Sequence, residues 1–198
     1  MSSTSTRASF PASSPGNAPV SSKLLSFFDK VAARPDVSVE ALFRGHEALL
    51  VGQRPARVSW DVLCDLYDRL DEIGCAGTSV ESFGELVLTS NSLRGVNAAL
   101  AAIASPHLMY RLANKWAGRF LLRHIEVGYE EVSKRRINIE YRIPESYRDC
   151  PNFFRVNHGT SVALPTLLGC PPATVRSTIE PRYHRMEIEV APYSNLGS

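Results

Sequence analysis

The chain has 198 residues, 44% of them hydrophobic and 21% charged, a composition typical of a soluble globular protein with one domain and a real core. Its 22 basic and 20 acidic residues give a formal net charge of +2, and the basic residues are scattered along the sequence. This distribution predicts neither a basic stripe that would bind nucleic acid nor a polybasic patch that would bind a membrane surface.

The sequence also favours a cytoplasmic protein. No apolar run approaches the ~20 residues that span a bilayer, and the N-terminus lacks the charged-then-apolar order of a signal peptide. The four cysteines, Cys64, Cys75, Cys150 and Cys170, form no C-x-x-C pair. In a reducing compartment we expect them to be free thiols.

Residues 1–21 are predicted to be a disordered tail. The first 22 residues contain eight serines, three prolines and a single charged side chain, too little apolar surface to offset the entropy lost on ordering. We expect one domain at 22–192, followed by a linker or terminal tail at 193–198. No internal repeat is visible.

Helical periodicity dominates the first half of the domain. Apolar residues recur every three or four positions in KLLSFFDKVAAR, in VSVEALF and, most clearly, in SWDVLCDLYDRLDEIG. Ser21 or Ser22, Ser38 and Ser59 are the expected N-caps, and Gly74 the stop of the third helix. RPARVSW is interpreted as a connection. Further helices are predicted at about 80–89, 92–104 and 107–123.

After Arg123 the apolar residues no longer recur every three or four positions but alternate with polar ones. HIEVGYEEV and RINIEYRIP alternate as strands around a polar SKR turn, and ATVRSTIE and YHRMEIEVAP alternate around a second turn. Between the two pairs, a helix is predicted over about 151–168, with Pro151 in its first turn and Pro165 kinking or ending it. The fold class is therefore α+β: a helical half, then a strand-strand-helix-strand-strand antiparallel sheet.

Several segments resemble a known class of signalling proteins. These are VSVEALFRG, RVSWDVLCDLYDRL, SPHLMYRLANKW and the run YRDCPNFFRVNHGTSVALPTLLGCPPATV. They are similar to the N-terminal sensory region that precedes histidine-kinase and related output modules in bacteria. The order of elements also resembles, more distantly, the haem-nitric-oxide-binding and 4-vinyl-reductase-like superfamily. Over residues 37–192, the resemblance implies a cytoplasmic sensor that signals to an output module or partner protein.

Two motifs of that superfamily are missing. The haem-binding branch carries a Y-x-S-x-R element that holds the haem propionates, and this chain has none. The zinc-binding branch has cysteines in its last hairpin, which here has none. His107 and His124, at the two ends of the predicted 107–123 helix, are the best placed for a haem ligand, but helix termini explain both. The cofactor is left unknown, with haem as one alternative.

Two segments provide the candidate ligand-binding residues. MYRLANKW places Tyr110, Asn114 and Trp116 on a helix with polar and aromatic groups able to line a pocket, although core packing explains the same pattern. In YRDCPNFFRVNHG, Phe154 is expected to face the sheet or a pocket, and His158 lies one turn further along the same helix.

Catalytic and metal sites are less well supported. Cys150 begins a helix, which lowers a thiol pKa, but His158 lies roughly 12 Å further along the helix axis, too far for proton transfer. Zinc needs closer ligand pairs than Cys150, His158 and Cys170 provide. The aspartates of the third predicted helix could serve in acid–base catalysis, but their spacing is that of a solvent-exposed helix face.

The leading hypothesis is therefore a non-enzymatic, dimeric sensory domain that binds an apolar or aromatic small molecule and passes on a conformational change. Two alternatives remain open. One is a ligand-free module for protein interaction or dimerisation. The other is a thiol-dependent enzyme that uses Cys150.

Overall fold

The computed structural model describes residues 19–50, 54–73, 79–90, 105–116 and 121–192. The tails at 1–18 and 193–198, and the helix predicted over 92–104, lie outside these ranges. Within the described ranges, no helix is long and apolar enough to cross a membrane.

The N-terminal half contains short helices and one small two-stranded sheet. Strand β1 (Pro19–Ser21) pairs antiparallel with β2 (Arg57–Ser59). The helical elements are η1 (Ser22–Leu24), α1 (Leu25–Ala32), α2 (Val39–Leu42), η2 (Glu47–Leu49), α3 (Trp60–Glu72), η3 (Val80–Phe83) and α4 (Gly84–Thr89). Two predictions need correction here. Residues 19–21, assigned to the tail, form β1, and the supposed connection before Trp60 contains β2, because Val20 and Val58 pair and are buried in the core.

The predicted serine caps are confirmed. Ser38 Oγ accepts a hydrogen bond from Ala41 N at 3.1 Å, and Ser59 Oγ accepts one from Val62 N at 3.3 Å. Ser21 caps η1 in the same way. Each serine oxygen satisfies an amide that the first helical turn leaves without a partner, so the helices begin where the sequence predicts.

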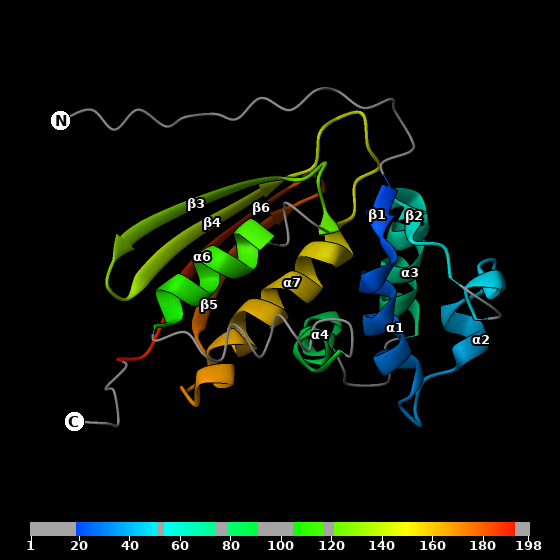
Figure 1. The fold of residues 1–198 in the computed structure, drawn as a ribbon, viewed down its shortest axis with the longest axis horizontal. Helices are drawn as coiled ribbons and strands as arrows, with labels where there is room; N and C mark the ends of the chain where they lie inside the picture. The colour runs from blue at the N-terminus through cyan, green and yellow to red at the C-terminus, as the bar shows by residue number, and fades with distance from the viewer. Residues whose placement is uncertain (1–18, 51–53, 74–78, 91–104, 117–120, 193–198) are drawn as a thin grey trace.

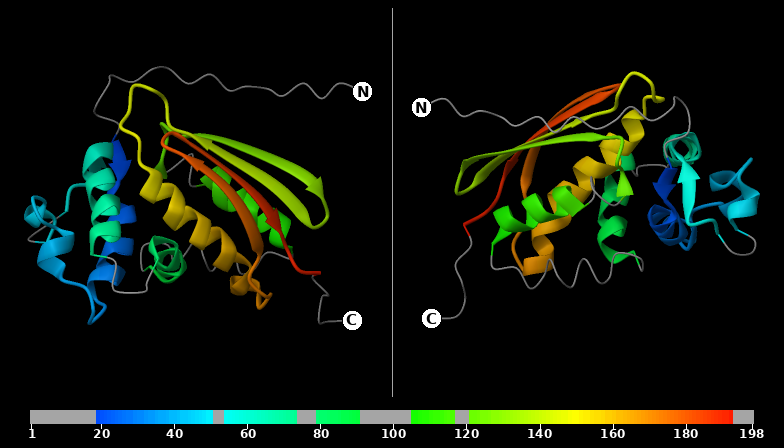
Figure 2. Two further views of the ribbon diagram at one scale, coloured as in Figure 1. Left: turned by 180° about the vertical axis from the view of Figure 1, so that it is seen from behind. Right: turned by 45° about the horizontal axis from the view of Figure 1, so that its top comes forward.

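The C-terminal half is a four-stranded antiparallel sheet with two helices on one face, which confirms the α+β fold class. Its elements are α6 (Pro106–Trp116), β3 (Glu126–Ser133), β4 (Arg136–Arg142), α7 (Pro151–Ala163), η6 (Leu164–Leu168), β5 (Thr174–Glu180) and β6 (Tyr183–Glu189), and the strand order is β3-β4-β6-β5. Figures 1 and 2 show α6 and α7 side by side beneath the sheet. The α-helix of α7 ends before Pro165, as predicted.

Alternation along the strands separates the two faces of the sheet. Ile137, Ile139 and Tyr141 of β4 are buried on the face toward the helices, while Arg136 and Arg142 at the ends of β4 are exposed. On β6, Met186 and Ile188 are buried in the same layer. The inner face therefore forms the core with α6 and α7, in keeping with the alternation along the strands.

Helix α7 joins the two halves through a backbone contact. A Cβ atom built on Gly159 would lie 1.8 Å from Glu81 O, and one built on Gly84 would lie 2.2 Å from Thr160 N. The Thr160 hydroxyl also donates to Gly84 O at 3.0 Å. Only glycine leaves room for the backbones of α7, η3 and α4 to approach this closely.

The acidic side of α3 binds α7 and the loop before it, rather than facing only solvent as predicted. Arg148 pairs with Asp65 and, at 2.7 Å, with Asp68. Arg155 lies between Asp71 and Glu81, with both carboxylates at 2.7 Å. These ion pairs hold α7 and the loop before it against α3 and η3. Because they are partly exposed, each contributes at most about 1 kcal/mol.

Replacement of Gly159 by alanine should therefore destabilise the whole domain. The added methyl would overlap the Glu81 carbonyl, which belongs to the backbone and cannot rotate away, so we expect a loss of about 3 kcal/mol in the free energy of unfolding. Denaturant-induced unfolding followed by circular dichroism measures the loss.

Gly128→Ala is the matched control. On β3, the new methyl would lie 3.5 Å from the Glu140 Cβ, an ordinary contact. This variant should be as stable as the wild type or slightly more so. An unfolding midpoint of Gly159→Ala equal to that of the control would contradict the close approach.

Candidate functional site

Helix α6 has an inner face in the core and an outer face toward solvent. Met109 and Tyr110 are fully buried, and Asn114 is 7% exposed. Arg111 and Lys115, on the opposite side, are exposed. The two faces have different functions in the fold, since one binds α7 and the sheet and the other borders a cavity.

Hydrogen bonds of the inner face tie α6 to α7 and β4. Tyr110 Oη donates to the carbonyl of Ser161, and Tyr141 Oη donates to Asn114 Oδ1. Asn114 Nδ2 in turn donates to Tyr110 O at 2.8 Å. Burial raises the pKa of both tyrosines, so the hydroxyls keep their protons and remain donors. Tyr110 and Asn114, predicted to line a pocket, are thus brought together in the buried interior.

Phe154 and His158 lie on the same face of the sheet, toward the edge formed by β5 and β6. The Phe154 ring is fully buried, with its centroid 5.3 Å from that of His184. His158 Nδ1 lies 2.6 Å from Ser177 Oγ, and His184 Nε2 lies 3.0 Å from the same oxygen. The predicted residues therefore form two groups, and the side chain of Trp116 is outside the described part of the chain.

His184 is a residue that the sequence analysis missed. It is fully buried on β6, and burial, with a smaller contribution from His158, lowers its pKa to about 4. Its Nδ1 has no hydrogen-bond partner among the described residues. The available signal was its place in the alternation of YHRMEIEV, in register with Met186 and Ile188 on the inner face.

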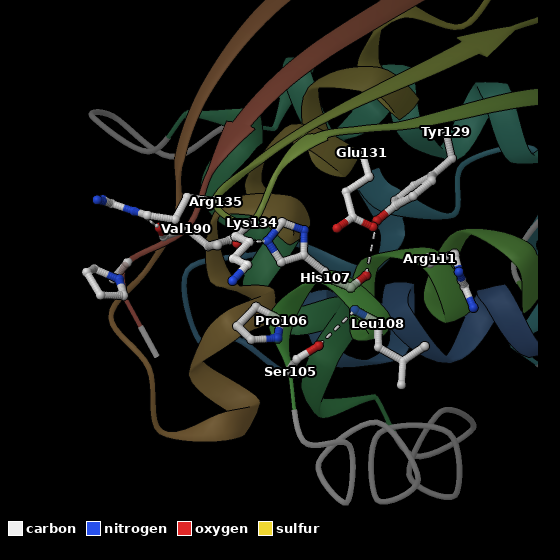
Figure 3. Close-up of a pocket in the computed structure, with 12 residues that line it drawn as sticks. Ser105, Pro106, His107, Leu108, Arg111, Tyr129, Glu131, Lys134, Arg135 and Val190 are labelled. Atoms are coloured by element: carbon white, nitrogen blue, oxygen red, sulfur yellow. Dashed lines mark hydrogen bonds between the residues drawn. The ribbon is translucent and has the colours of Figure 1, made fainter. Parts of the chain in front are cut away.

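A cavity of about 570 Å³ opens on the outer side of α6. Figure 3 shows it between the first turn of α6, the β3–β4 hairpin and the segment after β6. The residues around it are Ser105, Pro106, His107, Leu108, Arg111, Tyr129, Glu131, Lys134, Arg135, Val190, Ala191 and Pro192. We call it the α6 cavity. None of the predicted ligand-binding residues lines it.

Hydrogen bonds between α6 and the hairpin fix its walls. The His107 Nε2 bonds with the carbonyl of Lys134, and Tyr129 Oη donates to His107 O at 3.3 Å. The amide of Leu108 donates to Ser105 Oγ at 3.3 Å, which caps the helix. The first turn of α6 is therefore attached to β3 and to the turn of the hairpin.

The α6 cavity carries charges of both signs. Arg135 is held by Glu189 at 3.4 Å and by Val190 O at 3.2 Å. Burial and then the Glu131 carboxylate raise the pKa of Tyr129, while Arg111 opposes them. Both Glu131 and Arg111 are therefore close enough to the phenol to affect its ionisation.

The cysteines do not form a catalytic or metal site in the described structure. Cys64, Cys150 and Cys170 are free thiols, as predicted, and Cys75 lies outside the described residues. Cys64 and Cys150 are fully buried. The hydrogen bond with Cys150 and burial both raise the pKa of the Cys64 thiol. A nucleophile at Cys150 would therefore be inaccessible to substrate, and the described residues contain no cluster of three metal-binding side chains.

Comparisons with known proteins identify the fold but no close relative. No protein-family profile and no curated protein matches the sequence. Several solved structures of H-NOX domains match over most of their length. One, from work on haem distortion in the H-NOX family, has a TM-score of 0.60 at 10% identity, over 88% of this chain and 98% of its own.

Two further structures agree with the first. An Fe(II) unliganded H-NOX protein from K. algicida gives a TM-score of 0.53 at 12% identity, over 86% of this chain and 96% of its own. An oxygen-binding H-NOX domain related to soluble guanylate cyclases gives 0.51 at 12% identity, over 87% and 97%. The chain therefore has the fold of the haem-nitric-oxide-binding proteins that the sequence resembled, and the likeness shows the fold alone.

The described residues do not fit a haem. His107 Nε2 is bound to the Lys134 carbonyl, and the His124 ring is packed against Trp60 and Tyr147, with centroids 4.6 and 4.7 Å away. The buried His107 Nδ1 and His124 Nε2 have no hydrogen-bond partner among the described residues. The buried side chains of Tyr110, Asn114, Tyr141 and His184 lie between the helices and the sheet, and the chain lacks the Y-x-S-x-R element that would hold haem propionates.

The buried neutral histidines predict a loss of stability in acid. Burial lowers the pKa of His184 to about 4 in the folded chain, from an ordinary value of 6.5. Above pH 6.5 the contribution of the neutral His184 ring to the free energy of unfolding is fully present. As the pH falls toward 4, this contribution is lost because the unfolded chain binds a proton that the folded chain does not. Between pH 7 and pH 4.5, His184 should account for about 2 kcal/mol of lost unfolding free energy.

His184→Gln, which cannot titrate, should lose that part of the pH dependence, as measured by urea unfolding at the two pH values. His46 would serve poorly as a comparison because it is partly buried and pairs with Asp65, so wild type and His124→Gln are the references. The His124 pKa is also lowered to about 4 by burial, so its variant should lose a similar part. Equal pH dependence in all three proteins would contradict the neutral burial of these rings.

Proposed function

We propose that the chain is a regulatory domain that senses a small molecule with an apolar or aromatic body, bound in the α6 cavity. The observation that carries this proposal is the cavity itself. Its volume of about 570 Å³ lies within the usual range of ligand sites, and Leu108, Val190 and Pro192 contribute apolar surface beside the Tyr129 ring. The fold it shares with H-NOX domains supports a sensing function by analogy.

The signal would pass through α6. A ligand in the cavity contacts the first turn and outer face of this helix, and the inner face is bonded to α7 through Tyr110 and to β4 through Asn114. A ligand that binds one position of α6 more tightly shifts the population toward it. The hydrogen bonds then carry the shift to α7, which contacts the N-terminal helices. An output module or partner protein would detect this change.

A ligand-free interaction module is the second candidate. It is favoured by the outer face of α6, where Leu108 and Leu112 are each 37% exposed beside Arg111 and Lys115. Apolar side chains one turn apart, flanked by cations, suit an acidic amphipathic partner or a second copy of the chain. Dimerisation would use this face or an edge of the sheet.

A cavity-filling variant separates the two candidates. Ala191→Trp places a large ring in the α6 cavity and should abolish the rise in melting temperature that a bound aromatic compound produces. Leu50→Trp adds the same ring at an exposed site outside the cavity and should leave that response intact. Thermal shift across a panel of aromatic compounds, aliphatic compounds and haem measures both.

The sensing proposal would be wrong if no compound raised the melting temperature of the wild type, or if Ala191→Trp responded like Leu50→Trp. A Soret band in haem-treated protein that resists gel filtration would contradict the conclusion that haem does not fit. Binding of a partner by Ala191→Trp at wild-type affinity, with no ligand response in either protein, would favour the interaction module.

A further inference from the structure

Three charged side chains at the α6 cavity have no ion-pair partner among the described residues. They are Arg111 on α6, Glu131 on β3 and Lys134 in the hairpin turn. Other charges of the same sheet are paired: Arg135 and Arg136 bind Glu189, and Arg142 binds Glu140. The cavity thus offers two cations and one anion, a net charge of +1, for a ligand to bind.

The arrangement of these charges brings opposite signs near one aromatic ring. Tyr129 and Glu131 are two residues apart on β3 and project from the same face of the strand. Glu131 and Arg111 both shift the ionisation of the Tyr129 phenol, so both lie near it. Figure 3 shows Glu131 and Tyr129 extending from β3 toward α6, with Arg111 and Lys134 on opposite sides of the view.

Much of the remaining wall is apolar. Leu108, Val190, Ala191 and the two prolines provide aliphatic surface at the same cavity. A purely apolar ligand would leave Glu131 and Arg111 unpaired as it removed water from them, which is unfavourable. A simple anion would pair with Arg111 but would be repelled by Glu131, and a simple cation would have the reverse problem.

We propose that the α6 cavity binds a zwitterionic, amino-acid-like molecule with an aromatic or branched apolar side chain. Arg111 would hold its carboxylate with two parallel hydrogen bonds, and Glu131 would hold its ammonium group. The side chain would lie against Tyr129, Leu108 and Val190. Lys134 keeps the net charge of the site positive, which attracts the carboxylate. This assignment rests on the proposed function, because it names the ligand class of the same site.

Isothermal titration at low ionic strength tests the assignment with compounds that share one aromatic body. L-Phenylalanine carries both charges, 3-phenylpropionate only the anion, 2-phenylethylamine only the cation, and 2-phenylethanol neither. L-Leucine tests a branched side chain. Phenylalanine or leucine should bind roughly tenfold more tightly than any compound that lacks one charge, since a charge-assisted hydrogen bond of this kind is worth about a factor of ten.

Charge-removing variants assign each contact. Arg111→Gln should weaken the binding of phenylalanine and phenylpropionate roughly tenfold and leave the binding of phenylethylamine unchanged. Glu131→Gln should weaken the binding of phenylalanine and phenylethylamine and leave that of phenylpropionate unchanged. Lys115→Gln and Glu130→Gln are the matched controls. Each removes the same kind of charge from the same element at a residue that does not line the cavity, and each should bind phenylalanine like the wild type.

The outcomes distinguish this inference from the proposed function. If the neutral alcohol or a singly charged compound binds as tightly as the amino acids and Ala191→Trp blocks it, the zwitterion is wrong and the cavity remains the sensing site. The same holds if only compounds of another class bind there. If no compound of any class binds in an Ala191→Trp-sensitive way, both the zwitterion and the sensing function are overturned.

Discussion

The close approach of α7 to η3 and α4 is the constraint on which the rest of the structure depends. Gly159 and Gly84 let backbone atoms meet where any side chain would separate them. With α7 in that position, its flanking arginines reach the carboxylates of α3 and η3, and Phe154 reaches the inner face of the sheet. The helical half and the sheet are therefore joined by one helix that contacts both. A movement of α7 would therefore change contacts in both halves.

Helix α6 connects that central helix to the surface. Its inner face is bonded to α7 and β4 by Tyr110 and Asn114, and its first turn forms a wall of the α6 cavity. Because the same short helix contacts both cavity and core, ligand binding and a shift in helix packing are mechanically connected. The fold is that of H-NOX domains, but the chain lacks the Y-x-S-x-R element that would hold haem propionates, and buried tyrosine, asparagine and histidine side chains lie between the helices and the sheet. The proposed ligand site is consequently on the outer side of α6.

Much of this fold could be predicted from sequence, because apolar periodicity and capping are local. The serine caps, the two hairpins and the end of α7 before Pro165 all follow from residues within one or two turns of each other. The candidate site could not be predicted in the same way. The cavity is formed by three segments far apart in the chain, and Tyr129 and Glu131 have the same alternation as ordinary strand residues. His158 lies one turn after Phe154 on α7, but its contact with Ser177, which His184 shares, depends on strand register, which no local pattern specifies.

The central claim is that binding in the cavity is transmitted through α6 to α7. The most direct test is a map of backbone amide chemical shifts during titration with L-phenylalanine. The account predicts shifts in 105–111, 129–135 and 190–192, around the cavity, and further shifts near Ser161 that disappear in Tyr110→Phe while the cavity shifts remain. Cavity shifts without any change near Ser161 in the wild type, or shifts confined to other parts of the chain, would contradict it.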